Sequence, residues 1–188
     1  VVKTGGEQGI HAVSAAPYCS VSMLPVTYGY LLMLGAEGLK HVTEMAILNA
    51  NYLASSFEKL GFKILFKGKQ GRVGHEMIWD CSAFNKEYGI SELDIAKRLM
   101  DFGFHAPTLS FPVHGTLMVE PTESEPKEEL DRFIEALKTI REEMCEVAEG
   151  KADKTDNVLK NAPHTHKVLT ADEWTHTYPR SKAAYPLP

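Results

Sequence analysis

The sequence predicts an α/β fold: a small α+β domain in which helices cover an antiparallel or mixed sheet. Apolar residues recur at helical spacing in residues 37–60 and again after residue 125. Two short strand-like segments flank a turn at residues 67–72 that holds two glycines. A third strand-like segment, residues 116–120, lies between two helical segments. Each element has one apolar face, so the elements must pack as layers.

Two helices are predicted to follow the loop-like residues 1–21. The first covers residues 22–34, with Ser22 as its N-cap, Pro25 tolerated in the first turn and Gly35 as its stop. The second covers residues 37–60 and ends at Gly61, which suits a left-handed cap. Its expected buried stripe consists of Leu39, Val42, Met45, Ala46, Leu53 and Phe57.

A β-hairpin is predicted next, with strands at residues 62–66 and 73–80. Side chains alternate between the two faces of a strand. His75, Met77 and Trp79 are therefore expected on one face of the second strand, and Glu76 and Ile78 on the other.

The second half of the chain predicts a helix, a strand and a longer helix. Ser91 suits the N-cap of helix 91–102, with Asp94 in its first turn and Gly103 at its end. Residues 104–112 hold too many prolines for an inner strand. After strand 116–120, Thr122 and Glu125 fit a capping box for a helix that reaches residue 149. The residues expected to be buried are Leu93, Ile95, Ala96, Leu99 and Met100 in the first helix, and Leu130, Phe133, Ile134, Leu137, Ile140 and Met144 in the second.

Residues 151–188 are polar, contain four prolines and show little periodicity. Such a segment cannot form a core of its own. It is expected either to lie on the rest of the chain or to be a mobile end.

Composition excludes several classes of partner. The net charge is −5 and the basic residues form no stripe, which argues against nucleic acid. Cys19, Cys81 and Cys145 are widely separated, as expected for reduced thiols in a cytosolic-type protein. Residues 12–36 carry no charge, but Pro17, Pro25 and scattered polar residues favour a helix inside a larger protein over a membrane span.

The segment from His105 to residue 114 is the first candidate site. Pro107 and Pro112 hold the backbone extended, because a residue before proline avoids the helical region. Such a segment can present His105, Thr108 and Ser110 to a ligand. The alternative is a structural crossover whose His and Thr satisfy local hydrogen bonds. The residues alone leave both interpretations open.

Residues 14–20, SAAPYCS, are the second candidate, because small hydroxyl residues near a helix start suit an anion such as phosphate. A loop of small residues is the alternative. Metal sites find little support. His75 and Glu76 are neighbours on opposite strand faces, and His164 and His166 lie in the polar tail without further ligands at suitable spacing. The two tail histidines are expected in a solvated loop.

Several unusual strings resemble one family, glycine dehydrogenase (decarboxylating), the P-protein of the glycine cleavage system. They are HAVSAAPYCSVSMLPV, GAEGLK, AILNANYLA, GRVGHE, GISELDIAKRL, FGFHAPTLSFPVHGTLMVEPTESE and NAPH. The resemblance runs from about His11 into the tail. It implies the C-terminal part of a fold-type-I pyridoxal-phosphate (PLP) enzyme. Residues 1–36 would end the large PLP domain and 37–61 would be a connecting helix. Residues 62–150 would form the C-terminal small α/β domain, and 151–188 a C-terminal extension.

The resemblance also implies a reaction. Glycine condenses with PLP, which acts as an electron sink while CO2 leaves, and the aminomethyl group passes to the lipoyl arm of the H-protein. The family's PLP lysine lies in a His-Lys-Thr string that is not found here. The chain is therefore expected to lack a catalytic nucleophile and to be inactive alone. The implied site residues are His105, Thr108 and His75 for substrate or lipoyl arm, and Ser14, Tyr18 and Ser20 at the edge of the PLP phosphate site.

The implied partners are glycine, lipoylated H-protein and the remainder of the P-protein or its partner subunit, in an oligomer. The implied location is the cytoplasm, or the mitochondrial matrix in a eukaryote. Two alternatives stay open. One is a non-catalytic module that docks a lipoylated carrier or a partner subunit. The other is a small independent enzyme with a histidine pair, which no nucleophile–base or metal spacing supports. The resemblance does not fix a role for His114.

Overall fold

The computed structural model describes residues 6–10 and 20–186. The chain divides into two compact units, Val1–His41 and Val42–Pro188. The boundaries predicted at residues 36, 61 and 150 stay predictions. No helix in the part of the chain that the structure describes is long and apolar enough to cross a membrane.

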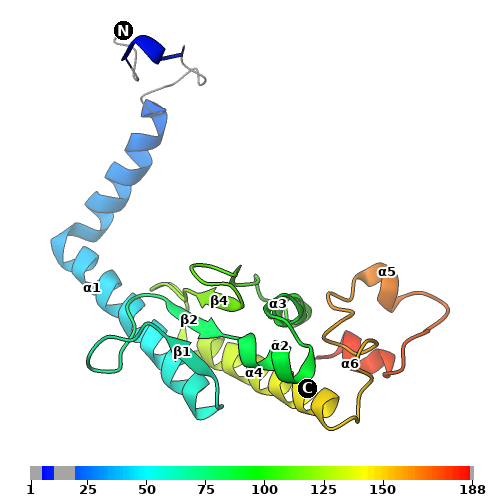
Figure 1. Ribbon diagram of the computed structural model, residues 1–188. Helices are drawn as coiled ribbons and strands as arrows, with labels where there is room; N and C mark the ends of the chain where they lie inside the picture. Colours follow the sequence, from blue (N-terminus) through cyan, green and yellow to red (C-terminus); the bar gives the residue numbers. More distant parts are fainter. Residues whose placement is uncertain (1–5, 11–19, 187–188) are drawn as a thin grey trace. The chain divides into compact units, whose positions relative to one another are not determined.

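The elements follow one another in the order shown in Figure 1. They are η1 (Gly6–Gln8), η2 (Val21–Met23), α1 (Leu24–Lys59), β1 (Lys63–Leu65), β2 (Met77–Asp80), α2 (Ser82–Tyr88), α3 (Glu92–Asp101), β3 (Thr108–Leu109), β4 (Thr116–Val119), α4 (Lys127–Ala148), α5 (His166–Leu169) and α6 (Arg180–Ala184).

Helix α1 consists of two helical stretches that meet at Gly35. This glycine has φ 61° and ψ −173°, which lies outside the helical region, so the predicted stop is confirmed. Pro25 falls in the first turn, as expected. Ser22 as the N-cap was wrong, because the chain forms the short turn η2 there. Ser20 precedes that turn, and its hydroxyl lies 2.8 Å from that of Ser22.

The sheet has the order β1-β2-β4-β3, and all three pairings are antiparallel. Trp79 of β2 pairs with Ile64 of β1 on one side and with Leu117 of β4 on the other. The predicted α+β class is therefore confirmed, with an antiparallel sheet. Strand β3 lies at the edge and is only two residues long, which suits its proline-rich surroundings.

The second hairpin strand is shorter than predicted, because residues 73–76 do not join the ladder. The side chain of Asn51 satisfies both backbone groups of Val73 instead, at 3.0 Å each. His75 therefore lies outside the strand and is exposed. The Asn51 side chain, 22 residues before Val73, thus takes the place of a partner strand for the Val73 backbone.

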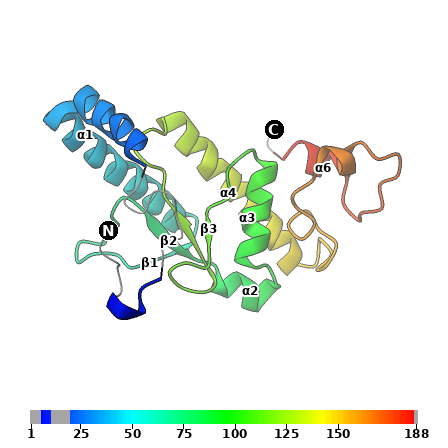
Figure 2. The same ribbon diagram turned by 90° about the horizontal axis from the view of Figure 1, so that it is seen from above.

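Helix α3 begins as predicted. Ser91 and Asp94 form a capping box, in which the Ser91 hydroxyl accepts from the Asp94 N–H and the Asp94 carboxylate accepts from the Ser91 N–H. Leu93 and Met100 were wrongly expected in the core: they are 44% and 50% exposed. The helix instead buries the side that carries Ile95, Arg98 and Leu99. Figure 2 shows this helix beside α4.

Helix α4 starts later than predicted, at Lys127, with Pro126 as its N-cap. The capping box of Thr122 and Glu125 was wrong: the Thr122 hydroxyl lies 2.8 Å from that of Ser124. The predicted buried stripe of α4 is confirmed except at Ile134, which is half-buried. Helix α2 was not predicted, because seven residues carry too little periodicity.

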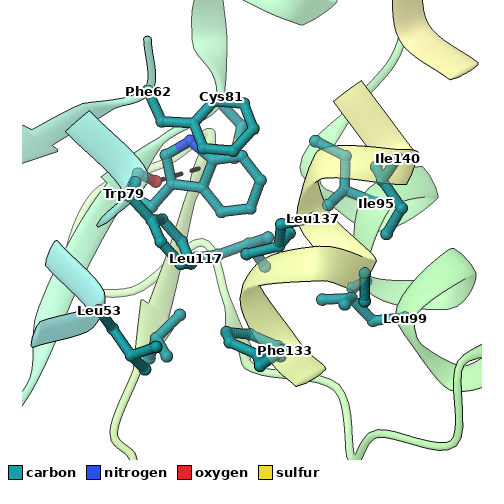
Figure 3. Packing of buried hydrophobic residues seen from close by; sticks show 14 of the residues in the cluster. Leu53, Phe62, Trp79, Cys81, Ile95, Leu99, Leu117, Phe133, Leu137 and Ile140 are labelled. Carbon is teal, nitrogen blue, oxygen red and sulfur yellow. Dashed lines mark hydrogen bonds between the residues drawn. The ribbon is translucent and has the colours of Figure 1, made fainter. Parts of the chain in front are cut away.

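Trp79 stands at the centre of the core and is fully buried (Figure 3). Its ring lies 4.5 Å from that of Phe62 and 5.4 Å from that of Phe57, centre to centre. Its indole N–H has no hydrogen-bond partner among the residues that the structure describes. Cys81 lies beside it as a free thiol, and burial raises the pKa of that thiol.

The C-terminal segment lies on the second unit rather than forming a mobile end. Val158 and Leu159 are part of the hydrophobic core. His164 was wrongly expected in a solvated loop: it is 8% exposed, and its Nδ1 lies 2.7 Å from Asp101 of α3. Its Nε2 lies 2.7 Å from the hydroxyl of Tyr178. These contacts hold the segment against α3.

Candidate functional site

A groove of about 460 Å³ opens on the second unit beside the end of β4. Segment 103–108 forms one wall, and the turn after β4 together with the start of α4 forms another. Leu53, Leu130 and Phe133 are among the apolar residues that line it. His105 and Thr108, which the sequence predicts as substrate-facing residues, both line this groove.

The wall that carries His105 is fixed by contacts on both sides of Gly103. Gly103 has φ 78°, a left-handed conformation that turns the chain out of α3. Before it, the carbonyl of Phe102 accepts a 2.7 Å hydrogen bond from Nη1 of Arg132. After it, the ring of Phe104 packs 5.0 Å from that of Phe133. The guanidinium of Arg132 lies over the Phe104 ring at 3.8 Å.

The opposite wall is held by a side chain from α1. Asn49 is buried, and its amide donates to the carbonyls of Thr122 and Glu125 at 3.0 and 3.4 Å. The turn from β4 into α4 is thereby attached to α1. This attachment positions Glu125 and Glu120, which line the groove.

His75 lies near the groove, because it is close to Glu120, which lines the groove. Its Nε2 is 3.8 Å from a carboxylate oxygen of Glu120 and 3.8 Å from one of Glu76. The His75 side chain is 60% exposed, so it belongs to the rim and does not itself line the groove. Within the described ranges, no group of three or more His, Cys, Asp or Glu residues could hold a metal ion.

His105 and Thr108 are exposed, and no described residue forms a hydrogen bond with either side chain. The local hydrogen bonds that the crossover alternative expects of His105 and Thr108 are therefore not formed among the described residues. Ser110 differs from them, because its hydroxyl donates to Glu92 at 2.7 Å. His114 lies 3.4 Å from the same hydroxyl and outside the groove.

The predicted phosphate-binding residues are placed only in part. Ser14 and Tyr18 lie outside the described residues, and Ser20 is exposed at the start of η2. The groove itself does not suit a phosphate. In the part of the chain that the structure describes, no lysine or arginine lines it, whereas Glu120, Glu125 and Glu129 do. The hydrogen bond from Arg132 lowers the pKa of Glu129, which therefore stays negatively charged.

Sequence reasoning did not find three residues that build the site: Asn49, Glu129 and Arg132. Glu129 and Arg132 are three apart in the sequence, a spacing at which helical side chains meet. Their ion pair could have been expected from that spacing. The contacts of Asn49 with the turn and of Arg132 with Phe102 and Phe104 have no local signal, because they join distant segments.

Comparison with known proteins gives one family. Residues 42–164 match the family model described as "Glycine dehydrogenase, C-terminal domain". The chain is also similar to proteins named glycine dehydrogenase (decarboxylating). Identity is 60% over 187 residues for the protein of Flavobacterium johnsoniae and 59% over 175 residues for that of Bacteroides fragilis. It is 54% over 187 residues for that of Bdellovibrio bacteriovorus.

The matches cover 93 to 100% of this chain but only 18 to 19% of these relatives. The chain thus spans about a fifth of their length.

Proposed function

Since this chain belongs to the family of the glycine dehydrogenase C-terminal domain, we propose that it supplies one wall of the active site of a glycine-decarboxylating oxidoreductase. In this proposal His105 and Thr108 face the substrate or the lipoyl arm, and His75 stands at the rim. PLP and the lysine that binds it belong to polypeptide outside this chain. The aminomethyl product passes to a lipoylated H-protein.

One observation carries the proposal: two polar side chains without a bonding partner converge on a groove with an apolar floor. His105 and Thr108 have no hydrogen-bond partner among the described residues, and both line the groove. Ligand sites are typically apolar hollows with a few polar groups that fix the ligand's orientation. The ring nitrogens of His105 and the hydroxyl of Thr108 can each donate or accept a hydrogen bond.

The chain's own contribution would be to orient the substrate and to keep water away. The floor, which includes Leu53, Leu130 and Phe133, removes water from one side of a bound group. The rim carboxylates, among them Glu120 and Glu125, favour a cationic group over an anionic one. A protonated amine therefore suits this edge better than a phosphate does.

The PLP phosphate does not fit this groove, because no lysine or arginine among the described residues lines it. We keep Ser14, Tyr18 and Ser20 as proposed contacts at the edge of the phosphate site, elsewhere in the complete enzyme. No step of the reaction is assigned to these residues.

The first stretch of α1 supports a larger assembly. Its apolar side chains are largely exposed: Met33 is 88% exposed, Val26 67% and Leu32 65%. A surface of this kind is typical of an interface. It supports the proposal that the chain packs against the remainder of the enzyme, in an oligomer. The proposed location is the cytoplasm, or the mitochondrial matrix in a eukaryote.

The test uses the complete enzyme with His105→Ala or Thr108→Val, and His114→Ala as the matched control on the same loop. Release of labelled CO2 from glycine should fall by roughly tenfold to a hundredfold in the first two variants, because substrate orientation is lost. The control should keep the parent rate, since His114 lies outside the groove. Parent-like rates in both groove variants would remove this wall from the active site.

The exposed face of α1 also favours the second candidate, a non-catalytic module that docks a lipoylated carrier or a partner subunit. Binding of lipoylated H-protein to this chain, with unchanged catalysis in the two groove variants, would favour that candidate. The chain alone should form no yellow, borohydride-reducible adduct with PLP. Such an adduct on one of its lysines would contradict both candidates.

A further inference from the structure

We infer that Arg132 is a positioning residue for the groove and that Glu129 orients it. The inference rests on the proposed function, because it concerns how His105 and Thr108 reach the groove. Arg132 itself does not line the groove. It acts through the two residues that flank Gly103, at the base of the wall that carries His105.

A single guanidinium holds the chain on both sides of this turn. Its Nη1 donates to the carbonyl of Phe102 at 2.7 Å, and its central carbon lies 3.8 Å from the centre of the Phe104 ring. Gly103 between them has φ 78° and carries no side chain that could restrict its rotation. Two backbone hydrogen bonds close the turn itself, from the Gly103 N–H to Met100 at 3.0 Å and from the Phe104 N–H to Leu99 at 3.1 Å. The two guanidinium contacts add a restraint on the Phe102 carbonyl and the Phe104 ring. His105 follows Phe104 directly, so its direction depends on this restraint.

The orientation of the guanidinium is itself fixed. Glu129, one turn earlier on α4, accepts from Nε at 2.8 Å and from Nη2 at 2.5 Å. These two bonds set the plane of the guanidinium and leave Nη1 for Phe102. Only arginine has enough donors in one plane for all three bonds while its face covers an aromatic ring.

The arrangement also connects the wall to the floor. Phe104 contacts Arg132 through its ring face, and Phe133 packs against the same ring at an interplanar angle of 70°. Phe133 lines the groove. A displaced Phe104 would therefore change both the direction of His105 and the shape of the floor.

The contribution of Arg132 to overall stability should be small. Its side chain is 36% exposed and that of Glu129 is 35% exposed, and ion pairs so accessible to water contribute little to folding. A positioning role and a merely structural role therefore predict different results.

The experiment uses the complete enzyme with Arg132→Gln, Arg132→Lys and Glu129→Gln. Lys138→Gln is the matched control. Lys138 pairs with Glu135 on the same helix and is also three residues from its partner, and the charged atoms are 3.5 Å apart. Three quantities are measured: amide hydrogen exchange in residues 103–109, kcat and KM for glycine, and the melting temperature.

Arg132→Gln should raise exchange in residues 103–109 by about tenfold and lower kcat/KM for glycine by about tenfold or more, with the melting temperature within a few degrees of the parent. Arg132→Lys should show nearly the same changes in exchange and in kcat/KM as Arg132→Gln. Lysine keeps the charge but lacks the planar guanidinium that makes the three hydrogen bonds. Glu129→Gln should give a smaller change in the same direction. The control should match the parent.

Unchanged exchange in residues 103–109 of Arg132→Gln would overturn the inference. Full recovery by Arg132→Lys would also overturn it, because charge alone would then suffice. Failure of the proposed function looks different. Faster exchange in Arg132→Gln, with parent-like rates in the His105 and Thr108 variants, would support the positioning role and remove the groove from catalysis.

Discussion

Replacing Arg98 by methionine should destabilise the second unit more than any surface change. Arg98 is fully buried between α3, α4 and the C-terminal segment. Its Nε and Nη2 donate to Glu143 at 3.0 and 2.6 Å, and its Nη1 donates to Asp101 at 2.9 Å. Nη2 also donates to the carbonyl of Lys182 at 3.1 Å. Methionine fills similar space but leaves the buried carboxylates without this partner.

The size of the loss follows from burial. Removing one partner of a buried ion pair costs about 3–5 kcal/mol. For a chain of this size, that corresponds to a drop in melting temperature of roughly 6–20 °C. Burial would raise the pKa of Asp101, but hydrogen bonds from His164 and Arg98 together lower it, and the variant keeps those from His164. The cost should therefore fall mainly on Glu143.

The loss should also depend on pH. Burial raises the pKa of Glu143 above its ordinary value of 4.5 although Arg98 opposes this rise. Without Arg98 the pKa rises further. A carboxyl with a raised pKa in the folded state destabilises that state as pH increases from the unfolded to the folded pKa. The difference between Arg98→Met and the parent should therefore be smallest near pH 4.5 and should grow towards pH 8.

Urea unfolding of the purified chain, followed by tryptophan fluorescence from pH 4.5 to 8, measures this difference. Lys63→Met is the control: Lys63 is 71% exposed and 2.9 Å from Asp80, so its loss should cost less than about 1 kcal/mol. A loss of that small size for Arg98→Met at pH 7 would refute the reasoning. So would a difference that shrinks as pH rises.

Two further predictions concern Asp80 and Trp79. Burial would raise the pKa of Asp80, but hydrogen bonds from Ser82 and Lys63 outweigh it and lower the pKa to about 2. The stability that this carboxylate provides is therefore present above its ordinary pKa of 3.8 and lost as pH falls towards 2. Asp80→Asn should flatten the acid limb of the unfolding curve, and an unchanged limb would contradict the assignment. Trp79→Ala should cost about 3–5 kcal/mol in urea unfolding, and Trp79→Phe clearly less, because the indole N–H has no partner to lose. A loss for Trp79→Phe as large as that for Trp79→Ala would contradict this reasoning.

Local patterns predicted many of the elements correctly. The capping box of Ser91 and Asp94 lies within one turn, and its geometry needs nothing from the rest of the chain. Gly35 and Gly61 both take the positive φ that the stop signals require. The prolines around His105 indicated an extended segment, and both His105 and Thr108 line the groove.

The errors at the turn before α4 and at residues 73–76 share one cause, which is competition from distant side chains. Thr122 and Glu125 have the spacing of a capping box. Asn49, 73 residues before Thr122, instead binds the carbonyls of that turn and holds it in another conformation. Asn51 likewise takes the backbone groups of Val73 from the sheet. Such contacts produce no periodic pattern in the sequence from which they could be predicted.

By itself, then, the sequence determined the family and the α+β class, and it predicted that His105 and Thr108 lie on an extended, proline-rich segment. These features depend on residue type and on neighbours within a turn or two. The tertiary structure alone decided that the C-terminal segment closes over Arg98 and that Arg132 holds the turn at Gly103. Both outcomes need groups from distant segments to be desolvated together, and such a contact forms only when the whole unit folds.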